Sequence, residues 1–233
     1  MPTPTDYLKK GFLRAIEPAI SLLARHNVSP NAITTAGTLL TITAGVVYGT
    51  GHIMTAGWIM SVTALFDVVD GEVARRTGRS TVFGAFYDST LDRVADGALM
   101  AGLTVFYATN RVHHNIYMMV ICLIGIIGTF LVSYTRARAE SLGIDAKVGV
   151  MQRPERIVLL SAPQALFGLF WNGWVLIGIV VLLSVTAWIT AVQRIAFVHR
   201  FTQHPDAKPI RIINDPASPP KNAGISATRR AQS

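Results

Sequence analysis

The chain has 233 residues, of which 51% are apolar and only 15% are charged, and its formal net charge at pH 7 is +8. Soluble domains usually carry about 25% charged residues. This chain also has repeated uncharged windows of about 20 residues, the length that spans a bilayer as a helix. The composition therefore excludes an ordinary soluble domain and predicts an all-α integral membrane protein. The single cysteine, Cys122, excludes a disulfide within the chain.

The first segment, residues 1–27, has the pattern of an amphipathic helix that precedes the first membrane span. Its apolar residues recur at spacings of three and four and are Leu8, Phe12, Ile16, Ile20 and Leu23. Charged residues occupy the positions between them. Such a helix lies in the membrane interface, or it packs its apolar face on the other helices. The pattern fits both arrangements.

Six apolar stretches follow, and each is long enough to predict a transmembrane helix. They are residues 32–51, 53–71, 84–108, 115–139, 153–171 and 174–197. We expect them to form one domain that covers residues 28–200. Arg111 is the only Lys or Arg in the loops after the first, third and fifth stretches. The positive-inside rule therefore places both termini in the cytoplasm.

The last segment, residues 201–233, is polar and rich in proline, and we expect it to be a largely disordered cytoplasmic tail. The basic charge of the chain lies on the predicted cytoplasmic side. It fits a surface that faces anionic lipid headgroups, so the charge requires no nucleic acid as a partner.

Five aspartates gather where the second apolar stretch ends and the third begins. They are Asp67, Asp70, Asp88, Asp92 and Asp96. On a helix, the first two share one face and the last three share another. A lone aspartate at a helix end is commonly a cap or the partner of an arginine. Several carboxylates that converge near a membrane interface repel one another unless cations neutralise them, and this spacing predicts a site for hard divalent cations.

The same stretch reads Asp67-x2-Asp70-Gly71-x2-Ala74-Arg75-x8-Gly84-x3-Asp88-x3-Asp92. It resembles the signature of the CDP-alcohol phosphatidyltransferases at every defined position. With the six predicted spans and the preceding helix, the resemblance covers residues 1 to about 200. It implies transfer of a phosphatidyl group from CDP-diacylglycerol to an alcohol, with release of CMP, by a membrane homodimer.

The resemblance also implies roles for single residues. Two divalent ions, Mg²⁺ or Mn²⁺, would be held by Asp67, Asp70, Asp88 and Asp92. Asp92 would also be the catalytic general base that takes the proton of the acceptor hydroxyl. The CDP-lipid would be bound by Asn31, Thr34, Gly71, Ala74, Arg75 and Gly84. Asp96 lies one turn beyond the signature, so the resemblance assigns it no role, and two readings stay open: it orients the neighbours of Asp92, or it pairs with an arginine.

A second group of arginines lies at the predicted cytoplasmic ends of the later helices and comprises Arg136, Arg138, Arg156 and Arg194. Positive-inside topology explains two or three of them. Guanidinium groups held together here would also suit an anionic acceptor such as a sugar phosphate. The segments "SYTRARAE" and "RPER" resemble those of actinobacterial phosphatidylinositol-phosphate synthases, which implies inositol phosphate as the acceptor. Arg136 stands where that group usually has lysine, and glycerol phosphate is the alternative acceptor.

Two other classes of protein compete with an enzyme. A transporter also carries intramembrane carboxylates, but they are expected near the bilayer midplane and on broken helices. Here they cluster at one predicted interface. A non-catalytic lipid-binding scaffold would need neither Asp92 nor a set of metal ligands.

Overall fold

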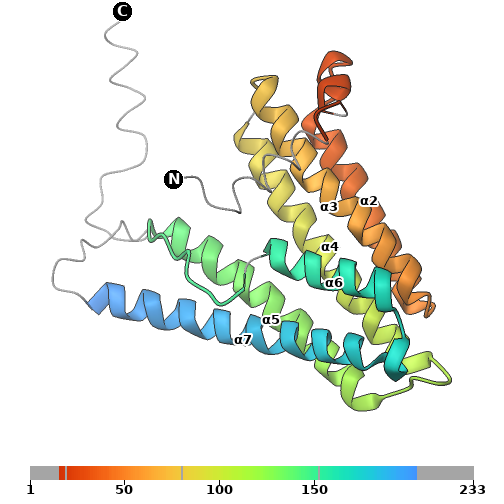
Figure 1. Cartoon of the computed structure of the whole chain (residues 1–233). Coiled ribbons are helices and arrows are strands. Elements are labelled where there is room, and N and C mark those ends of the chain that lie inside the picture. Colours follow the sequence, from red (N-terminus) through yellow and green to blue (C-terminus); the bar gives the residue numbers. More distant parts are fainter. Residues whose placement is uncertain (1–15, 19, 80, 152, 204–233) are drawn as a thin grey trace, which may run out of the picture.

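The computed structural model describes residues 16–18, 20–79, 81–151 and 153–203. Within this part of the chain the regular elements are helical and no strand occurs (Figure 1). The long helices, in chain order, are α2 (Pro30–Gly49), α3 (Ile53–Arg76), α4 (Val82–Thr109), α5 (Ile116–Ser141), α6 (Arg153–Phe167) and α7 (Trp174–Gln203), and a short 3₁₀ turn, η1 (Phe170–Gly173), precedes α7. Each of the six predicted stretches corresponds to one of these helices. The first half of the predicted amphipathic helix and nearly all of the predicted tail lie outside the described residues.

Four segments of the described chain are long and apolar enough to cross a membrane, and they are α2, α3, α5 and the segment Phe170–Gln203. Helix α4 has 28 residues but carries several charged residues in its first half. Helix α6 has only 15 residues, fewer than the roughly 20 that a straight span needs. The apolar helices make the chain a multi-pass membrane protein.

Close helix contacts fix the positions of α3 and α4. Helix α2 packs on both of them, α5 packs on α4 and α7, and α6 packs on α3 (Figure 1). A Cβ atom added to Gly102 of α4 would lie 1.9 Å from the carbonyl oxygen of Gly45 of α2. A Cβ on Gly57 of α3 would lie 2.3 Å from the backbone nitrogen of Ala165 of α6. Small residues permit this backbone approach, which is a main source of helix association in a bilayer.

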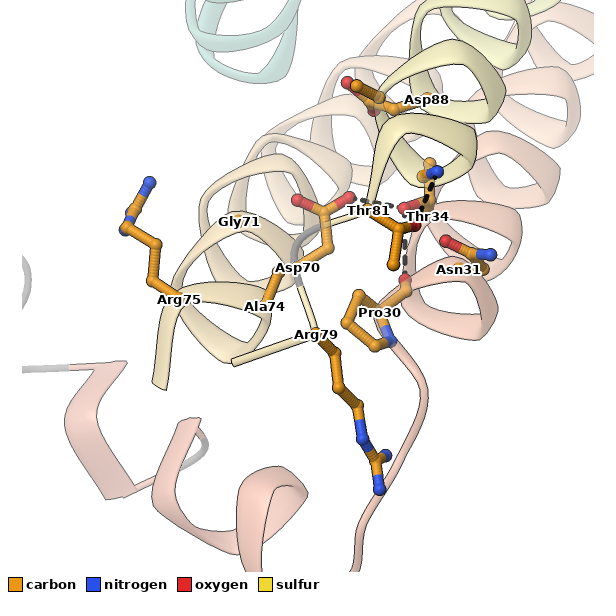
Figure 2. A pocket seen from close by; sticks show the side chains of 12 residues that line it. Pro30, Asn31, Thr34, Asp70, Gly71, Ala74, Arg75, Arg79, Thr81 and Asp88 are labelled. Atoms are coloured by element: carbon orange, nitrogen blue, oxygen red, sulfur yellow. Dashed lines mark hydrogen bonds between the residues drawn. The ribbon is translucent and has the colours of Figure 1, made fainter. Parts of the chain in front are cut away.

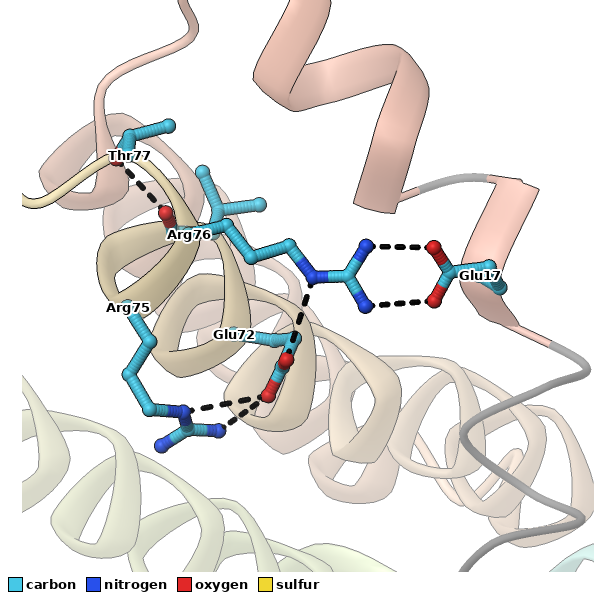
Figure 3. Close-up of polar contacts among 6 residues, drawn as sticks. Glu17, Glu72, Arg75, Arg76 and Thr77 are labelled. Atoms are coloured by element: carbon cyan, nitrogen blue, oxygen red, sulfur yellow. Dashed lines mark hydrogen bonds and ion pairs between the residues drawn. The ribbon is translucent and has the colours of Figure 1, made fainter.

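The described part of the N-terminal segment packs against α2 and α3. One buried apolar cluster joins them and consists of Ile20, Ile33, Val69 and Val73. The Arg76 guanidinium donates two hydrogen bonds to the Glu17 carboxylate, at 2.5 and 2.6 Å (Figure 3). These contacts fit the second of the two predicted arrangements, in which the apolar face packs on the other helices.

Candidate functional site

The end of α3 and the starts of α2 and α4 enclose an open pocket of about 230 Å³, here called the first pocket (Figure 2). All of the residues that the sequence predicts for CDP-lipid binding line it, and they are Asn31, Thr34, Gly71, Ala74, Arg75 and Gly84. Arg79 and Thr81 also line it, and sequence analysis missed both. They lie in the short connection between α3 and α4, where no periodicity reveals a shared surface.

Two helix N-termini meet at the first pocket. Ser29 caps α2, because its hydroxyl accepts a hydrogen bond from the Ala32 backbone nitrogen. Thr81 caps α4 in the same way through the Gly84 backbone nitrogen, at 2.9 Å. A Cβ on Gly84 would lie 3.1 Å from the Thr81 hydroxyl, so glycine keeps this corner open. Helix N-termini carry a partial positive charge and favour phosphate groups.

Asp70 is the more enclosed of the two signature aspartates that line the first pocket, with 8% of its surface exposed. Its Oδ2 accepts a hydrogen bond of 2.8 Å from the Thr34 hydroxyl (Figure 2). Asp67 and Asp88 both lie close enough to Asp70 to repel its charge. Asp88 lines the same pocket from α4, whereas Asp67 is exposed and does not line it.

The donor chemistry around Asp70 fits a divalent cation. Asp67 of α3 and Asp88 of α4 lie in electrostatic range of Asp70 with like charge, and hard cations such as Mg²⁺ and Mn²⁺ prefer oxygen ligands. In the described residues, no three His, Cys, Asp or Glu side chains are close enough together to hold an ion as they stand. The metal assignment of the four signature aspartates therefore stays a prediction.

Arginines border the first pocket on its α3 side. Arg75 Nη2 lies 2.6 Å from Glu72 Oε2, and the Arg75 side chain is 67% exposed (Figure 3). Arg79 donates a hydrogen bond of 3.0 Å to the Asn27 carbonyl oxygen. Both guanidinium groups are exposed, so they remain accessible to an anionic ligand.

A second pocket, of about 600 Å³, opens further along α4, between α4, α5, α6, α7 and the loop that precedes α6. Asp92 lines this second pocket, although Asp88, one turn earlier on α4, lines the first. Three of the four predicted acceptor arginines also line it, and they are Arg136, Arg156 and Arg194.

Arg93 and Lys147 line the second pocket too, and the sequence did not identify them as site residues. Arg93 stands next to Asp92 in the sequence, which was an available signal, and its Nη2 lies 3.6 Å from Asp92 Oδ2.

The arginines of the second pocket are held in different ways. Arg194 is 9% exposed. Its Nε donates a hydrogen bond of 2.9 Å to the Val148 carbonyl oxygen, and its Nη1 donates to that of Val132. Arg136 Nε donates to Glu140 Oε1 at 2.9 Å. Arg194 is therefore fixed by backbone, whereas Arg136 is held by an exposed side chain.

Arg138 does not line the second pocket. Its Nη1 instead donates a hydrogen bond of 3.4 Å to Ser141 Oγ, and its side chain is exposed. Residues two apart lie on different faces of a helix. Since Arg136 faces the pocket, Arg138 faces away, and the structure brings together three of the four predicted arginines.

Comparison with known proteins identifies the family of this chain. The family model for CDP-alcohol phosphatidyltransferase matches residues 27–198. The chain belongs to the CDP-alcohol phosphatidyltransferase family, and it is a phosphatidyltransferase of phospholipid biosynthesis. A phosphatidylinositol phosphate synthase of Streptomyces avermitilis is 36% identical over 210 residues, which cover 86% of this chain and 84% of the relative.

Solved structures of a Mycobacterium tuberculosis phosphatidylinositol phosphate synthase are similar to the whole helical domain. The structure with CDP-DAG bound has a TM-score of 0.73 and 29% identity, and the match covers 83% of this chain and 96% of that one. The structure in complex with manganese and citrate has a TM-score of 0.71 and 30% identity, with 82% and 90% covered.

Proposed function

We propose that this enzyme transfers the phosphatidyl group of CDP-diacylglycerol to a hydroxyl of inositol phosphate and releases CMP in a metal-dependent reaction. One observation carries the proposal. Asp88 and Asp92 lie one turn apart on α4 but line two pockets of different chemistry. The first pocket has glycines and helix N-termini, which suit a nucleotide diphosphate. The second has arginines, which suit an anionic acceptor.

The first pocket is proposed to hold the CDP end of the lipid. Gly71, Ala74 and Gly84 have no side chain beyond Cβ, so the backbone there admits close approach by a ligand. Arg75 and Arg79 supply guanidinium groups for the diphosphate. The related enzyme from M. tuberculosis was solved with CDP-DAG bound, which supports a CDP-lipid as the donor.

Two metal ions, Mg²⁺ or Mn²⁺, are proposed to be held by Asp67, Asp70, Asp88 and Asp92. When bound, such ions would neutralise the diphosphate and the charge that develops on the departing CMP. The manganese in the related structure and the like charges around Asp70 support this assignment.

Asp92 is proposed to be the general base. Its side chain is 14% exposed and lies in the second pocket, where the acceptor would bind. The carboxylate takes the proton of the acceptor hydroxyl, and the freed oxygen attacks the phosphorus on the lipid side. The bond from that phosphorus to the CMP oxygen breaks, so the phosphatidyl group moves to the acceptor and the proton stays on Asp92.

The acceptor phosphate is proposed to bind Arg136, Arg156 and Arg194. These residues come from three helices, and Arg136 and Arg156 both lie in electrostatic range of Arg194. A cluster of like charges of this kind is relieved by an anionic ligand. The relative named phosphatidylinositol phosphate synthase favours inositol phosphate over glycerol phosphate as that ligand.

The membrane arrangement is proposed to be six spans with both termini in the cytoplasm, with the N-terminal segment at the interface and the enzyme acting as a homodimer. Helices α4 and α6 would complete the set of six. The distribution of Lys and Arg among the loops supports the orientation, which puts the ends of α3 and the starts of α4 and α6 on the cytoplasmic side.

One assay tests the proposal. Purified enzyme with CDP-diacylglycerol and Mg²⁺ is offered inositol phosphate, glycerol phosphate, free inositol or serine separately, and CMP release is measured. We expect CMP release with inositol phosphate alone. Release with glycerol phosphate alone would move the acceptor assignment and leave the reaction in place. No release with any of the four would reject the reaction.

A further inference from the structure

Asp96, which the family signature does not include, lies at ion-pair distance from an arginine of the second pocket. Its Oδ2 is 3.9 Å from Arg156 Nη2, and the two side chains are 12% and 13% exposed. Asp96 follows Asp92 by one turn of α4, and Arg156 lines the same pocket as Asp92. The ion pair thus joins the helix of the proposed base to a guanidinium of the proposed acceptor site.

Arg156 lies among other positive charges. Arg93, Arg136 and Arg156 are all in electrostatic range of Arg194. Like charges this close favour arginine rotamers that point away from one another and out of the pocket. Arg194 is held against this repulsion by two backbone carbonyl oxygens, and Arg136 is held by Glu140. Asp96 occupies the corresponding place beside Arg156.

The contact is not needed to hold the two helices together. Helix α6 is fixed against α3 by the close approach at Gly57. It is also held to α2, because the Tyr48 hydroxyl of α2 donates a hydrogen bond to the Leu160 carbonyl oxygen of α6. Helix α4 packs on α2 and α5. In the described chain, α4 and α6 are not among the pairs of helices that pack extensively. Asp96 therefore acts on the Arg156 side chain more than on the position of α6.

We propose that Asp96 is a positioning residue that holds Arg156 in the second pocket and thereby sets the affinity for the phosphate of the acceptor. This rests on the proposed function, because it takes the second pocket as the acceptor site. A carboxylate near an anion site also repels the anion. If Asp96 positions Arg156, removing the carboxylate raises the acceptor KM. If Asp96 only repels the anionic acceptor, removing the carboxylate lowers the acceptor KM.

The test measures kcat and the KM values for inositol phosphate and for CDP-diacylglycerol in Asp96→Ala, Asp96→Asn, Arg156→Ala and the double variant Asp96→Ala/Arg156→Ala. We expect Asp96→Ala to raise acceptor KM about tenfold, the scale of one charge-assisted contact. Asp96→Asn keeps the shape of the side chain but removes its charge, and since the contact is an ion pair at 3.9 Å, its increase is similar to that of Asp96→Ala. In the Arg156→Ala background, Asp96→Ala adds no further increase, because the carboxylate acts through that guanidinium.

Two controls accompany these variants. The KM for CDP-diacylglycerol stays at the wild-type value, which shows that each variant is folded. Glu17→Ala also removes the carboxylate partner of an arginine, Arg76. Neither of these residues lines the first or the second pocket, so acceptor KM stays within about twofold of the wild-type value.

Several results would overturn the inference. A lower acceptor KM in Asp96→Ala means that the residue only repels the acceptor. An additive increase in the double variant means that Asp96 acts elsewhere. A raised acceptor KM in Arg156→Ala with no change in Asp96→Ala and Asp96→Asn defeats the positioning role alone. An unchanged acceptor KM in Arg156→Ala rejects the acceptor site itself, and the inference falls with it.

Discussion

The Thr34 hydroxyl of α2 donates a hydrogen bond of 2.8 Å to Asp70 Oδ2 of α3. Asp70 is buried, with 8% of its surface exposed, and a buried carboxylate needs hydrogen-bond partners to offset its lost hydration. The sequence suggested Thr34 only as a contact of the nucleotide. The structure shows that it also fixes the orientation of a signature aspartate.

Replacing Thr34 with valine removes this hydrogen bond and leaves the side chain nearly the same shape. A hydrogen bond to a charged group contributes about 1.5–3 kcal/mol, so we expect kcat/KM for CMP release to fall about 10- to 150-fold. Part of the loss should return at raised Mg²⁺, since a misplaced ligand lowers metal affinity. The measurement is kcat/KM as a function of Mg²⁺ concentration.

Thr38→Val is the matched control for that variant. Thr38 is also buried on α2, but its hydroxyl donates to the Thr34 carbonyl oxygen and not to a carboxylate. We expect nearly wild-type activity from it. Equal losses in the two variants would show that the effect comes from packing of α2 and not from Asp70.

Removal of divalent metal should abolish turnover. The carboxylates around Asp70 repel one another, and a divalent ion with its phosphate ligands would neutralise them. We expect no CMP release in excess EDTA, and recovery when Mg²⁺ or Mn²⁺ is added beyond the chelator. Full turnover in excess EDTA would reject the metal site.

The sequence predicts where the helices lie more reliably than where they end. The second predicted span stops at residue 71, but α3 continues to Arg76. Glu72 pairs with Arg75 and Arg76 at helical spacing, which sustains the helix after its hydropathy has fallen. The fifth predicted span runs to residue 171, but α6 ends at Phe167. Gly168 and Trp171 have positive φ angles there, and hydropathy does not detect that turn.

The site divides in a similar way between what spacing reveals and what only three dimensions reveal. The spacing of Asp88 and Asp92 predicts a shared helix face, and both do lie on α4. It does not predict that the two residues line different pockets, because the other walls of each pocket come from distant parts of the chain. Lys147, for example, lies in the loop before α6, and Arg194 lies on α7. The hydrogen bond from Arg194 to the Val148 carbonyl oxygen holds that loop against α7.

Replacing Asp92 with asparagine should remove the proton acceptor and leave the first pocket intact. We expect kcat to fall at least about 10²-fold, the usual scale for loss of a general base, with KM for CDP-diacylglycerol nearly unchanged. Asp145→Asn is the control. Asp145 is 63% exposed, and within the described chain it forms an ion pair with Lys147. Wild-type kcat in Asp92→Asn would mean that another group is the base.

The ion pair between Glu17 and Arg76 should make stability depend on pH at the acidic end. The hydrogen bond from Arg76 lowers the pKa of Glu17 below the ordinary value of a glutamate. Stability from a carboxylate with a lowered pKa is fully present above the unfolded pKa and is lost as pH falls through the folded pKa. We expect Glu17→Gln to have a slightly lower Tm than the wild type at pH 7. The difference should shrink below about pH 4.5, and a difference independent of pH would contradict the assignment.

Substitution of a proposed acceptor arginine should raise the KM for inositol phosphate, whereas substitution of Arg138 should not. Arg136→Ala and Arg194→Ala each remove a guanidinium that lines the second pocket, and one charge-assisted bond to phosphate is worth about 1.5–3 kcal/mol. We therefore expect KM for inositol phosphate to rise about 10- to 150-fold, with KM for CDP-diacylglycerol unchanged. Arg138→Ala removes the same charge from the opposite face of α5 and should leave both KM values near wild type. If Arg138→Ala raised acceptor KM as much as the other two, general positive charge and not the pocket would attract the acceptor.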